Sequence, residues 1–483
     1  MAGIGFELKK LFNTRSTFGY FRACFYTAVV TIGPYVLATT MILTIQALMK
    51  SMDVDYHTRQ LFLASIVYPF IFSQIVSSGF VMLITRFIAD KLYCEQFEEI
   101  LPSLYGIIAV VLLIAAVPVF IFYYCSPLDL YLKIASYLLY MELIVMWLQG
   151  VYLSALKDYM SIVKAYAAGS VAAVILAYIA LWLNVANTAL NIILAVDIGI
   201  FLIVVLLMKN IDRIFRTTSQ THFALLEYVD NCFSLFLINF FYTLGIYLPN
   251  IIIWFSPLQV KIADTYLFAP IYDVATFYAF LSILPAMLMF VVSTELKFYD
   301  KYKAYFMYIT GKGNYKEIND ARQDMLRVMW SEITNIIEFQ MVVSLFALAM
   351  GNYLLPKIGI TQETLDIFDV LLFAAYSTGI MQIIVIILLY FDDKYGALMT
   401  TGFFLIANAV CNLVSLVIGE HTYGFGTFIA CFLSLLLALS RLYYYTNRID
   451  YYIFCSQPVF NNRRPGFLTQ MMSKSKGELG KRD

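Results

Sequence analysis

Twelve separate runs of apolar residues, each long enough to cross a lipid bilayer, account for most of this chain. A membrane-spanning helix needs about 20 predominantly apolar residues. The composition agrees, because 61% of the 483 residues are hydrophobic and only 13% are charged. In hydrocarbon a helix can satisfy its own backbone hydrogen bonds, so the sequence predicts an all-α integral membrane protein. We expect spans at 23–48, 61–86, 103–124, 130–153, 163–184, 187–208, 226–254, 265–294, 336–355, 367–391, 397–418 and 424–446.

The spans fall into two groups of six, separated by a basic loop. Ahead of the first span, Lys9 and Lys10 stand among apolar side chains, a pattern typical of a short helix on a membrane surface. The expected regions are an interfacial N-terminal segment (1–22), a first six-helix bundle (23–208), a cytoplasmic linker (209–225), a second six-helix bundle (226–446) that includes a cytoplasmic hairpin (295–335), and a basic cytoplasmic tail (447–483).

Lysine and arginine are distributed unevenly among the connecting segments. With the N-terminus in the cytoplasm, all but five of the 32 basic residues fall on the cytoplasmic side. Basic loops tend to remain in the cytoplasm, so both termini of this multi-pass protein are predicted to be cytoplasmic. The basic residues expected outside are Lys50, Arg59, Lys133, Lys261 and Lys357.

Prolines occur at corresponding places in the two halves. Pro34 follows Gly33 in the first span, and Pro249 lies in the seventh. Because proline removes a backbone hydrogen bond, we expect helix breaks at Pro34, Pro249 and Pro270. The eighth segment is too long for a simple span, so Pro270 and Pro285 are expected to kink it or to separate a short interfacial piece. Broken helices at matching positions are typical of transporters built from repeats.

Polar side chains recur at helical spacing on four spans. Lipid offers them no partner, so they face either a neighbouring helix or a wet cavity. Either explanation suits a single stripe, but four stripes spread over both halves favour a shared polar path. The stripes are Thr27, Thr31, Tyr35 and Thr39; Ser65, Tyr68, Gln74, Ser77 and Ser78; Asn239, Tyr242, Thr243 and Asn250; and Thr401, Asn408, Asn412 and Ser415.

Ionisable residues within spans are a sharper signal, because burying an unpaired charge costs several kcal/mol. We predict that Glu142, with Gln149 seven residues later on the same helix face, and Asp273 line the translocation path. Asp197 and Asp230 are expected closer to the membrane surface, where we interpret them as structural bonds between helices.

The sequence indicates no catalytic centre, bound metal or cofactor. The three histidines, His57, His222 and His421, fall in loops, and the seven cysteines have no spacing typical of a disulfide or metal framework. Asp392 and Asp393 form a local acidic pair in a short loop. A metal site there is the lesser alternative to a solvated turn that caps the next helix.

Residues 295–335 form the part of the chain that is least typical of a transporter. Charges alternate with aromatic residues, which predicts a membrane-surface helical hairpin with its turn near Gly311–Asn314. The hairpin is either a structural connector or a docking site for a cytoplasmic or membrane partner.

Four elements carry a resemblance to a known family: AGIGFELKKLF at 2–12, the pair Gly33-Pro34, LLYFDDKYGAL at 388–398 and DYYIFCSQPVF at 450–460. Over essentially its whole length the chain resembles the PelG family, the inner-membrane transporters of Pel exopolysaccharide systems, which are related to Wzx flippases and MATE exporters. The family is not enzymatic, so the resemblance brings no catalytic residues.

The resemblance implies two six-helix bundles of MATE or Wzx type around a central cavity, with alternating access. It implies an amino-sugar polysaccharide, or its lipid-linked precursor, as cargo. Partners would be a cytoplasmic glycosyltransferase and other membrane proteins of a Pel-type system; no nucleic acid is expected. Sugar rings stack on aromatic side chains, so Tyr35, Tyr242 and Tyr272 are candidate contacts.

Three other functions remain open at this stage. A cation-coupled exporter of small molecules on the same fold would need a buried acidic pair, whereas the carboxylates are scattered along the sequence. A membrane-embedded enzyme would commonly need a histidine or clustered carboxylates at the membrane face, and no expected span contains a histidine. A passive scaffold for a polysaccharide synthase is opposed only by the polar stripes.

Overall fold

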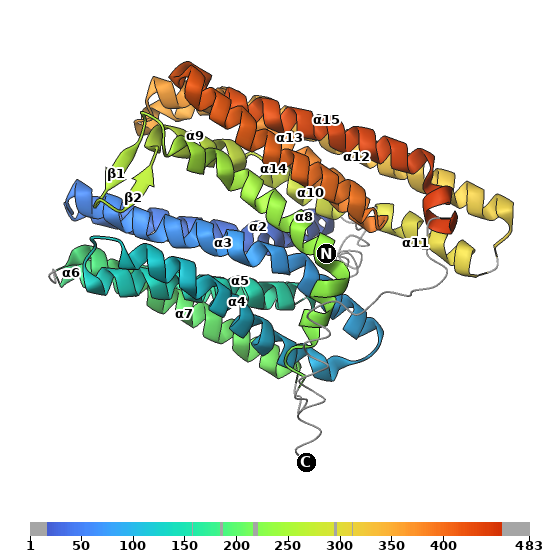
Figure 1. Ribbon diagram of the computed structural model, residues 1–483, viewed down its shortest axis with the longest axis horizontal. Coiled ribbons are helices and arrows are strands. Elements are labelled where there is room, and N and C mark those ends of the chain that lie inside the picture. The colour runs from blue at the N-terminus through green and yellow to red at the C-terminus, as the bar shows by residue number, and fades with distance from the viewer. Residues whose placement is uncertain are drawn as a thin grey trace, which may run out of the picture. The chain divides into compact units, whose positions relative to one another are not determined.

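The computed structural model describes residues 17–156, 158–183, 187–215, 221–293, 297–311 and 313–455 (Figure 1). Twelve helical segments in this part are long and apolar enough to cross a membrane, and they coincide with the twelve apolar runs. The predicted all-α membrane fold is therefore confirmed. The expected N-terminal surface segment and most of the basic tail lie outside the described residues.

Contacts divide the chain into two compact units. Among the described residues, unit 1 contains 17–32, 248–260 and 269–455, and unit 2 contains 33–247 and 261–268. The long helices of unit 2 are α3 (Tyr56–Tyr93), α4 (Ile100–Tyr124), α5 (Leu130–Ala155), α6 (Tyr159–Trp182) and α7 (Thr188–Ile214). Unit 1 contains α9 (Pro270–Leu281), α10 (Leu284–Ser293), α11 (Tyr299–Thr310), α12 (Tyr315–Leu354), α13 (Gln362–Tyr390), α14 (Lys394–Ile418) and α15 (Phe425–Asn447).

Two helices contribute to both units. These are α2 (Thr17–Ser51) and α8 (Ala224–Ile253), so the contact units differ from the expected bundles at these helices. Both helices continue through their prolines, Pro34 and Pro249, and the predicted breaks are not interruptions of helix. The division between units nevertheless falls beside each proline, where the helix lacks one backbone hydrogen bond.

The eighth span differs from the prediction at its start. Pro270 is the first residue of α9, where its missing N–H would have no helical partner in any case, so it begins a helix and does not break one. The interruption within this span lies between α9 and α10, just ahead of Pro285. Before Pro270 the chain forms two short strands, β1 (Val260–Ile262) and β2 (Tyr266–Phe268).

Close packing within unit 2 depends on glycine. Helices α6 and α7 lie side by side (Figure 1), and Gly169 faces Gly199 where they meet. A Cβ on Gly169 would lie 2.5 Å from the Gly199 carbonyl oxygen, so a larger side chain cannot fit without separating the helices. Small residues at helix contacts are typical of membrane proteins, because van der Waals packing holds their helices together.

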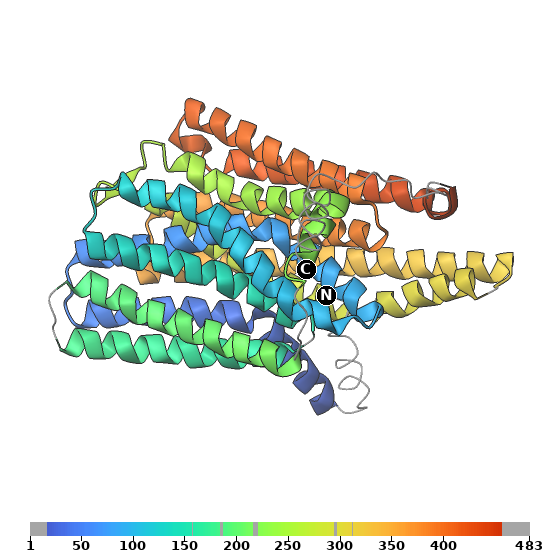
Figure 2. The same ribbon diagram turned by 60° about the horizontal axis from the view of Figure 1, so that its bottom comes forward.

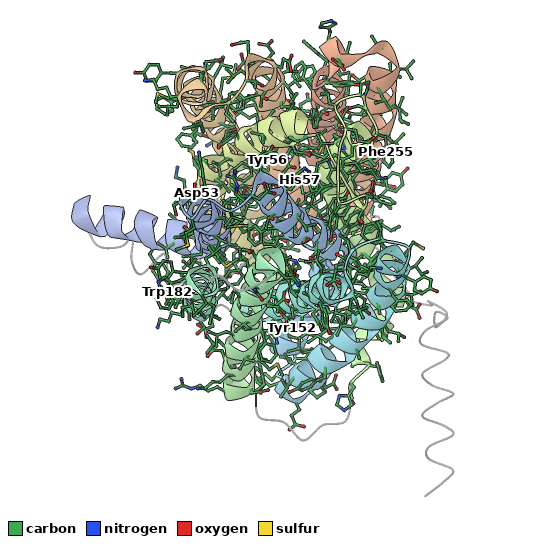
Figure 3. The ribbon with its side chains drawn as sticks, turned by 90° about the vertical axis from the view of Figure 1, so that its left-hand side faces the viewer. Asp53, Tyr56, His57, Tyr152, Trp182 and Phe255 are labelled. Carbon is green, nitrogen blue, oxygen red and sulfur yellow. The ribbon has the colours of Figure 1, made fainter. Side chains whose placement is uncertain are left out.

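Unit 2 also has polar contacts in its interior. Figure 3 looks at the end of this unit where Asp53, Tyr56 and His57 lie at the α2–α3 turn. Farther inside, the Tyr152 side chain on α5 is fully buried, and its hydroxyl lies 2.9 Å from Ser103 Oγ on α4. Each buried hydroxyl thereby satisfies the other.

Helix α13 occupies the centre of unit 1. It packs against α9, α12, α14 and α15, and its side chains Leu371, Met381 and Leu388 are completely buried. The predicted hydrophobic run 367–391 is thus an interior helix with little exposed surface.

The hairpin α11–α12 extends past the other helices of unit 1 (Figure 2). Asn314 caps α12 through a reciprocal capping box with Glu317, and no proline or glycine interrupts residues 315–350. The expected surface helix and the ninth span are therefore one helix of 40 residues. At 1.5 Å per residue it is about 60 Å long, roughly twice the hydrocarbon thickness of a bilayer. If such a helix spans a bilayer, part of it must extend beyond the hydrocarbon.

We expect Gly169→Val to destabilise the protein, because the added side chain would collide with the Gly199 backbone. The thermal unfolding midpoint in detergent should fall well below the wild-type value, as it does for other overpacked cores that lose about 1–3 kcal/mol. Gly150→Val is the matched control, since no atom lies within 4 Å of a Cβ placed there. Equal midpoints for the two variants would contradict the α6–α7 contact.

Candidate translocation site

Two carboxylates come together inside unit 2. Glu142 on α5 and Asp197 on the adjacent helix α7 interact electrostatically. The Asp197 side chain is only 6% exposed, and both of its carboxylate oxygens, together with Glu142 Oε2, are buried without a hydrogen-bond partner. The structure does not support our interpretation of Asp197 as a structural bond between helices.

Gln149 belongs to the same face of α5 as Glu142. Its side chain is 2% exposed, its Nε2 lies 3.5 Å from the Met208 sulfur on α7, and its Oε1 is buried without a partner. This face of α5 is therefore turned toward α7.

Unpaired carboxylates are unusual in such surroundings. Two negative charges side by side repel each other, and each loses favourable hydration when it is buried. A proton on one of the carboxyl groups, or a cation near them, would relieve both costs. The pair is the main chemical feature of unit 2.

A second group of candidates connects α3 with the part of α8 that belongs to unit 2. Asn239 Nδ2 donates to the Ser78 carbonyl oxygen over 2.6 Å, and the Tyr247 hydroxyl donates to Gln74 Oε1. Asn239, Ser78 and Gln74 belong to the predicted stripes, whereas Tyr247 does not, and the two bonds join one helix to another. The Tyr242 side chain on α8 is half-buried.

The stripe on α2 is divided between the units at Gly33. Thr27 is fully buried in unit 1, and the buried Oγ1 of Thr31 has no hydrogen-bond partner. Tyr35, in unit 2, is 38% exposed and is the most accessible of the aromatic candidates for a sugar contact.

Asp273 has a different environment in unit 1. Its carboxylate accepts hydrogen bonds from Asn250 Nδ2 at 2.7 Å, from Trp254 Nε1 at 3.0 Å and from the Ala269 backbone N–H at 3.1 Å. Asn250 was predicted beside it on the path, and the structure brings the two together. Because these donors come from the end of α8 and the start of α9, the carboxylate fastens the two helices.

The asparagines of α14 lie in the interior of unit 1. Asn408 and Asn412 are completely buried, and each donates to the backbone carbonyl four residues earlier on its own helix. Thr427 donates to Asn412 Oδ1 at 2.8 Å, and its Oγ1 lies 2.8 Å from the hydroxyl of Tyr272, which is also fully buried. This chain links α9, α14 and α15. A polar stripe on a helix is explained by hydrogen bonds of this kind between helices as well as by a wet cavity.

Sequence reasoning missed an ion pair at one end of unit 1. The Arg441 guanidinium on α15 donates to both carboxylate oxygens of Asp393, at 2.8 and 2.9 Å. Asp393 also caps α14 by accepting the Gly396 N–H at 3.0 Å, as predicted, but its side chain is buried and is not part of a solvated turn. The rings of Tyr445 and Tyr452, stacked 4.4 Å apart, each lie within 6 Å of the guanidinium. Within the described residues, no cluster of three His, Cys, Asp or Glu side chains could hold a metal ion.

Aromatic contacts extend this cluster to α11. The Tyr302 hydroxyl donates to the Tyr390 carbonyl oxygen at 3.0 Å, and its ring packs against Phe306 and Phe391. Burial and the nearby Asp392 raise the pKa of Tyr302, so the hydroxyl stays protonated and remains a donor. Two of the strings that carry the family resemblance, 388–398 and the described part of 450–460, thus meet beside Arg441.

The structure therefore places the predicted site residues in several groups, some in each unit. Glu142 and Gln149 share a face, and Asp273 and Asn250 are bonded, as are the α14 residues and Tyr272 through Thr427. That all of them line one translocation path stays a prediction.

Comparison with known structures identifies the fold. The chain is similar to a mutant of the Vibrio cholerae MATE transporter VcmN, with a TM-score of 0.61, 12% identity and coverage of 93% of this chain and 99% of that one. It is also similar to the MATE transporter ClbM in complex with Rb⁺ (TM-score 0.55, 12% identity, coverage 88% and 97%) and to a MOP superfamily transporter from Pyrococcus furiosus (0.51, 11%, 89% and 96%). No curated protein matches the chain by sequence.

These likenesses define a multi-pass membrane protein with the fold of MATE and MOP superfamily transporters. The family model of PelG, described as an exopolysaccharide exporter (EPS-E), matches residues 1–454. The chain belongs to the PelG family, and the resemblance seen in the sequence is confirmed.

We expect Asp393→Asn to lower the thermal unfolding midpoint strongly. The substitution leaves the Arg441 guanidinium, whose side chain is 14% exposed, without its anionic partner. Removing one member of a buried ion pair costs about 3–5 kcal/mol. Asp392→Asn is the control, because Asp392 is 57% exposed and its ion-pair partner, Lys394, is partly exposed as well. If both variants unfold at the wild-type temperature, the pair is not structural.

Proposed function

We propose that this protein moves an exopolysaccharide, or its lipid-linked precursor, across the cytoplasmic membrane by alternating access. The observation that carries the proposal is the match to an exopolysaccharide exporter family over residues 1–454, on a chain with a MATE-type transporter fold. An amino-sugar polymer of Pel type is the cargo that the resemblance favours. Transport of a growing polymer and flipping of a lipid-linked unit remain equal alternatives.

The proposed setting is the inner membrane, with both termini in the cytoplasm. The distribution of lysine and arginine supports this orientation. In that orientation the α11–α12 hairpin projects into the cytoplasm, where a glycosyltransferase that makes the polymer could reach it. Other membrane proteins of a Pel-type system are the remaining proposed partners.

Among the candidates for the path, Glu142 and Gln149 have the strongest support. Both lie on the membrane-spanning helix α5, and one buried oxygen of each, Glu142 Oε2 and Gln149 Oε1, has no hydrogen-bond partner among the described residues. A buried group that costs free energy in the resting protein is explained if it binds something during transport. The Asp273 carboxylate already accepts hydrogen bonds from its neighbours. It could bind cargo on the path only by exchanging those bonds for bonds to the cargo.

A second candidate function is the export of small molecules coupled to a cation. The sequence argued against this function, because its carboxylates are scattered and show no acidic pair within the spans. The proximity of Glu142 and Asp197 supplies such a pair and favours coupling to protons or to a monovalent cation. Coupling of this kind is also compatible with polysaccharide as the cargo.

Deletion of the gene should abolish external polysaccharide and leave sugar or polymer inside the cell, because a polar chain cannot cross the bilayer unaided. The measurement is secreted and cell-retained amino sugar in the deletion strain with and without complementation. Restoration by the wild-type gene supports export. Unchanged external polymer in the deletion strain would contradict the proposal and favour the small-molecule exporter, which drug and ion flux would then test.

The double variant Glu142→Gln with Asp197→Asn should export little or no polymer while remaining folded and inserted, because it can no longer bind a cation or a proton at the pair. A binding readout accompanies the export assay. Addition of Na⁺ at constant ionic strength, or acidification, should change the tryptophan fluorescence of the wild-type protein, since Trp147 lies on α5 with Glu142. That change should vanish in the double variant.

The exposed carboxylate Glu363 provides the control variant, Glu363→Gln, which should behave as wild type in both assays. Wild-type export by the double variant would exclude the pair from the transport mechanism.

A further inference from the structure

The eighth span, which belongs to unit 1, is interrupted near its middle. Helix α9 ends at Leu281 and α10 begins at Leu284, and we call the two residues between them, Ser282 and Ile283, the break. Since α9 has 12 residues and α10 has 10, the break lies close to the centre of the span. At that depth a bilayer offers no water, and irregular backbone is tolerated only where it is buried in protein or lines a cavity. The polar groups of the break therefore need partners other than solvent.

The break frees carbonyl oxygens that a continuous helix would satisfy. Pro285 has no N–H, so it cannot donate to the Leu281 carbonyl four residues earlier. The Ser282 N–H bonds to the Ala279 carbonyl at 3.2 Å, three residues back, so the last turn of α9 is tightened. Carbonyl groups at the C-terminal end of a helix carry a partial negative charge. The end of α9 therefore makes the break electronegative.

Gln340 on α12 is bonded to the break. Its side chain is 1% exposed, and its Nε2 donates to the Ser282 carbonyl oxygen at 3.1 Å and to Ser344 Oγ at 3.3 Å. These two bonds use both N–H groups of the amide. Its Oε1 is buried and has no hydrogen-bond partner among the described residues. Because the oxygen and nitrogen of an amide share one carbon atom, Oε1 also lies beside the break.

Oxygen acceptors are thus in excess around the break. The Ser282 hydroxyl already donates to the Ala279 carbonyl at 2.7 Å, and the amide hydrogens of Gln340 are used. Gln340 Oε1 and the Leu281 carbonyl still need a donor or a cation. An acceptor left unsatisfied in hydrocarbon is costly, so a bound species at this place would lower the free energy of the protein.

The charge of the surroundings indicates which species fits. The buried carboxylate of α12 is Glu332, which already binds Lys297 Nζ at 2.7 Å and the Ser293 hydroxyl at 2.7 Å. Glu332 is eight residues from Gln340, or about 12 Å along the helix, so it does not reach the break. Neutral oxygens can replace the hydration shell of a monovalent cation. A divalent cation would need an anion beside it, because the cost of burying an ion rises steeply with its charge.

We propose that the break binds an alkali-metal cation, Na⁺ or K⁺, through Gln340 Oε1, the Leu281 carbonyl and the Ser344 hydroxyl. The cation gives the two unpaired oxygens a partner and offsets the partial negative charge at the end of α9. Ends of half-helices and unwound carbonyls are the groups that coordinate cations in broken membrane helices. The site goes beyond the proposed function, because it lies in unit 1, apart from Glu142 and Asp197, and assumes nothing about the cargo.

Thermal unfolding of the purified protein in detergent tests the site. Replacing choline by Na⁺ or K⁺ at constant ionic strength should raise the unfolding midpoint by several degrees, because a ligand that binds the folded state stabilises it. The experiment uses the Glu142→Gln, Asp197→Asn variant, so that the carboxylates of unit 2 cannot produce the effect. The larger of the two rises identifies the ion. Equal midpoints in Na⁺, K⁺ and choline would overturn the proposal and leave a water molecule as the partner of Gln340.

Three further substitutions in the same background locate the effect. Gln340→Leu removes the candidate ligand and should abolish the rise, whereas Gln323→Leu makes the same change at an exposed position of α12 and should leave it intact. Pro285→Ala supplies an N–H for the Leu281 carbonyl, so the rise should become smaller. Only the difference between salts is compared, because Gln340→Leu also deprives the Ser282 carbonyl of its donor. A rise that survives unchanged in both Gln340→Leu and Pro285→Ala would contradict the site.

Equilibrium binding of a radiolabelled cation counts the ions directly. The background variant should bind a single Na⁺ or K⁺ per chain, and the variant that also carries Gln340→Leu should bind none. Undiminished binding by that variant would exclude Gln340 as a ligand and overturn the proposal. Neither measurement involves transport, so the cation site and the proposed export of polysaccharide stand or fall separately.

Discussion

Every structural feature of this protein follows from the need to satisfy backbone hydrogen bonds where water is absent. A lipid bilayer supplies no donors or acceptors, so a chain that is 61% hydrophobic can cross it only as helices. Once the backbone is satisfied internally, the remaining freedom lies in the side chains. Within the bundle, each polar side chain either finds a partner on another helix or stays unsatisfied at a cost in free energy.

That distinction separates structure from candidate function. Asp273 has three donors and the Arg441–Asp393 pair is bidentate, so these charges stabilise the arrangement of helices within unit 1. Glu142 and Asp197 have oxygens without partners. A charge that its surroundings already satisfy offers a cargo or a coupling ion little gain in free energy on binding. The acidic groups of unit 2 have more to gain, which is why the proposed path includes them.

The sequence predicted the features that depend on local pattern. Twelve apolar runs gave twelve spans, and Asp393 was expected to cap α14, which it does. Contacts between distant residues could not be predicted in the same way. Arg441 and Asp393 are 48 positions apart, and Tyr68 and Leu267 are 199 apart, so no periodicity joins them.

The errors have equally physical reasons. The boundary of the ninth span was misplaced because charged residues on α12 indicated a separate surface helix, whereas an uninterrupted backbone with a good cap continues as one helix. Pro270 was read as a break because proline is excluded from helix interiors, although it is equally suited to a first turn.

The places where the chain passes between the units are of two physical kinds. In α2 and α8 the passage lies beside a proline, where the helix has one hydrogen bond fewer and bends at lower cost than elsewhere. At residues 261–268 the passage is instead a short hairpin, whose backbone is bonded to Tyr68 of α3 and whose Tyr266 ring packs on the Tyr68 ring. Proline therefore makes the passage within a helix, and hydrogen bonds and aromatic packing make it outside one.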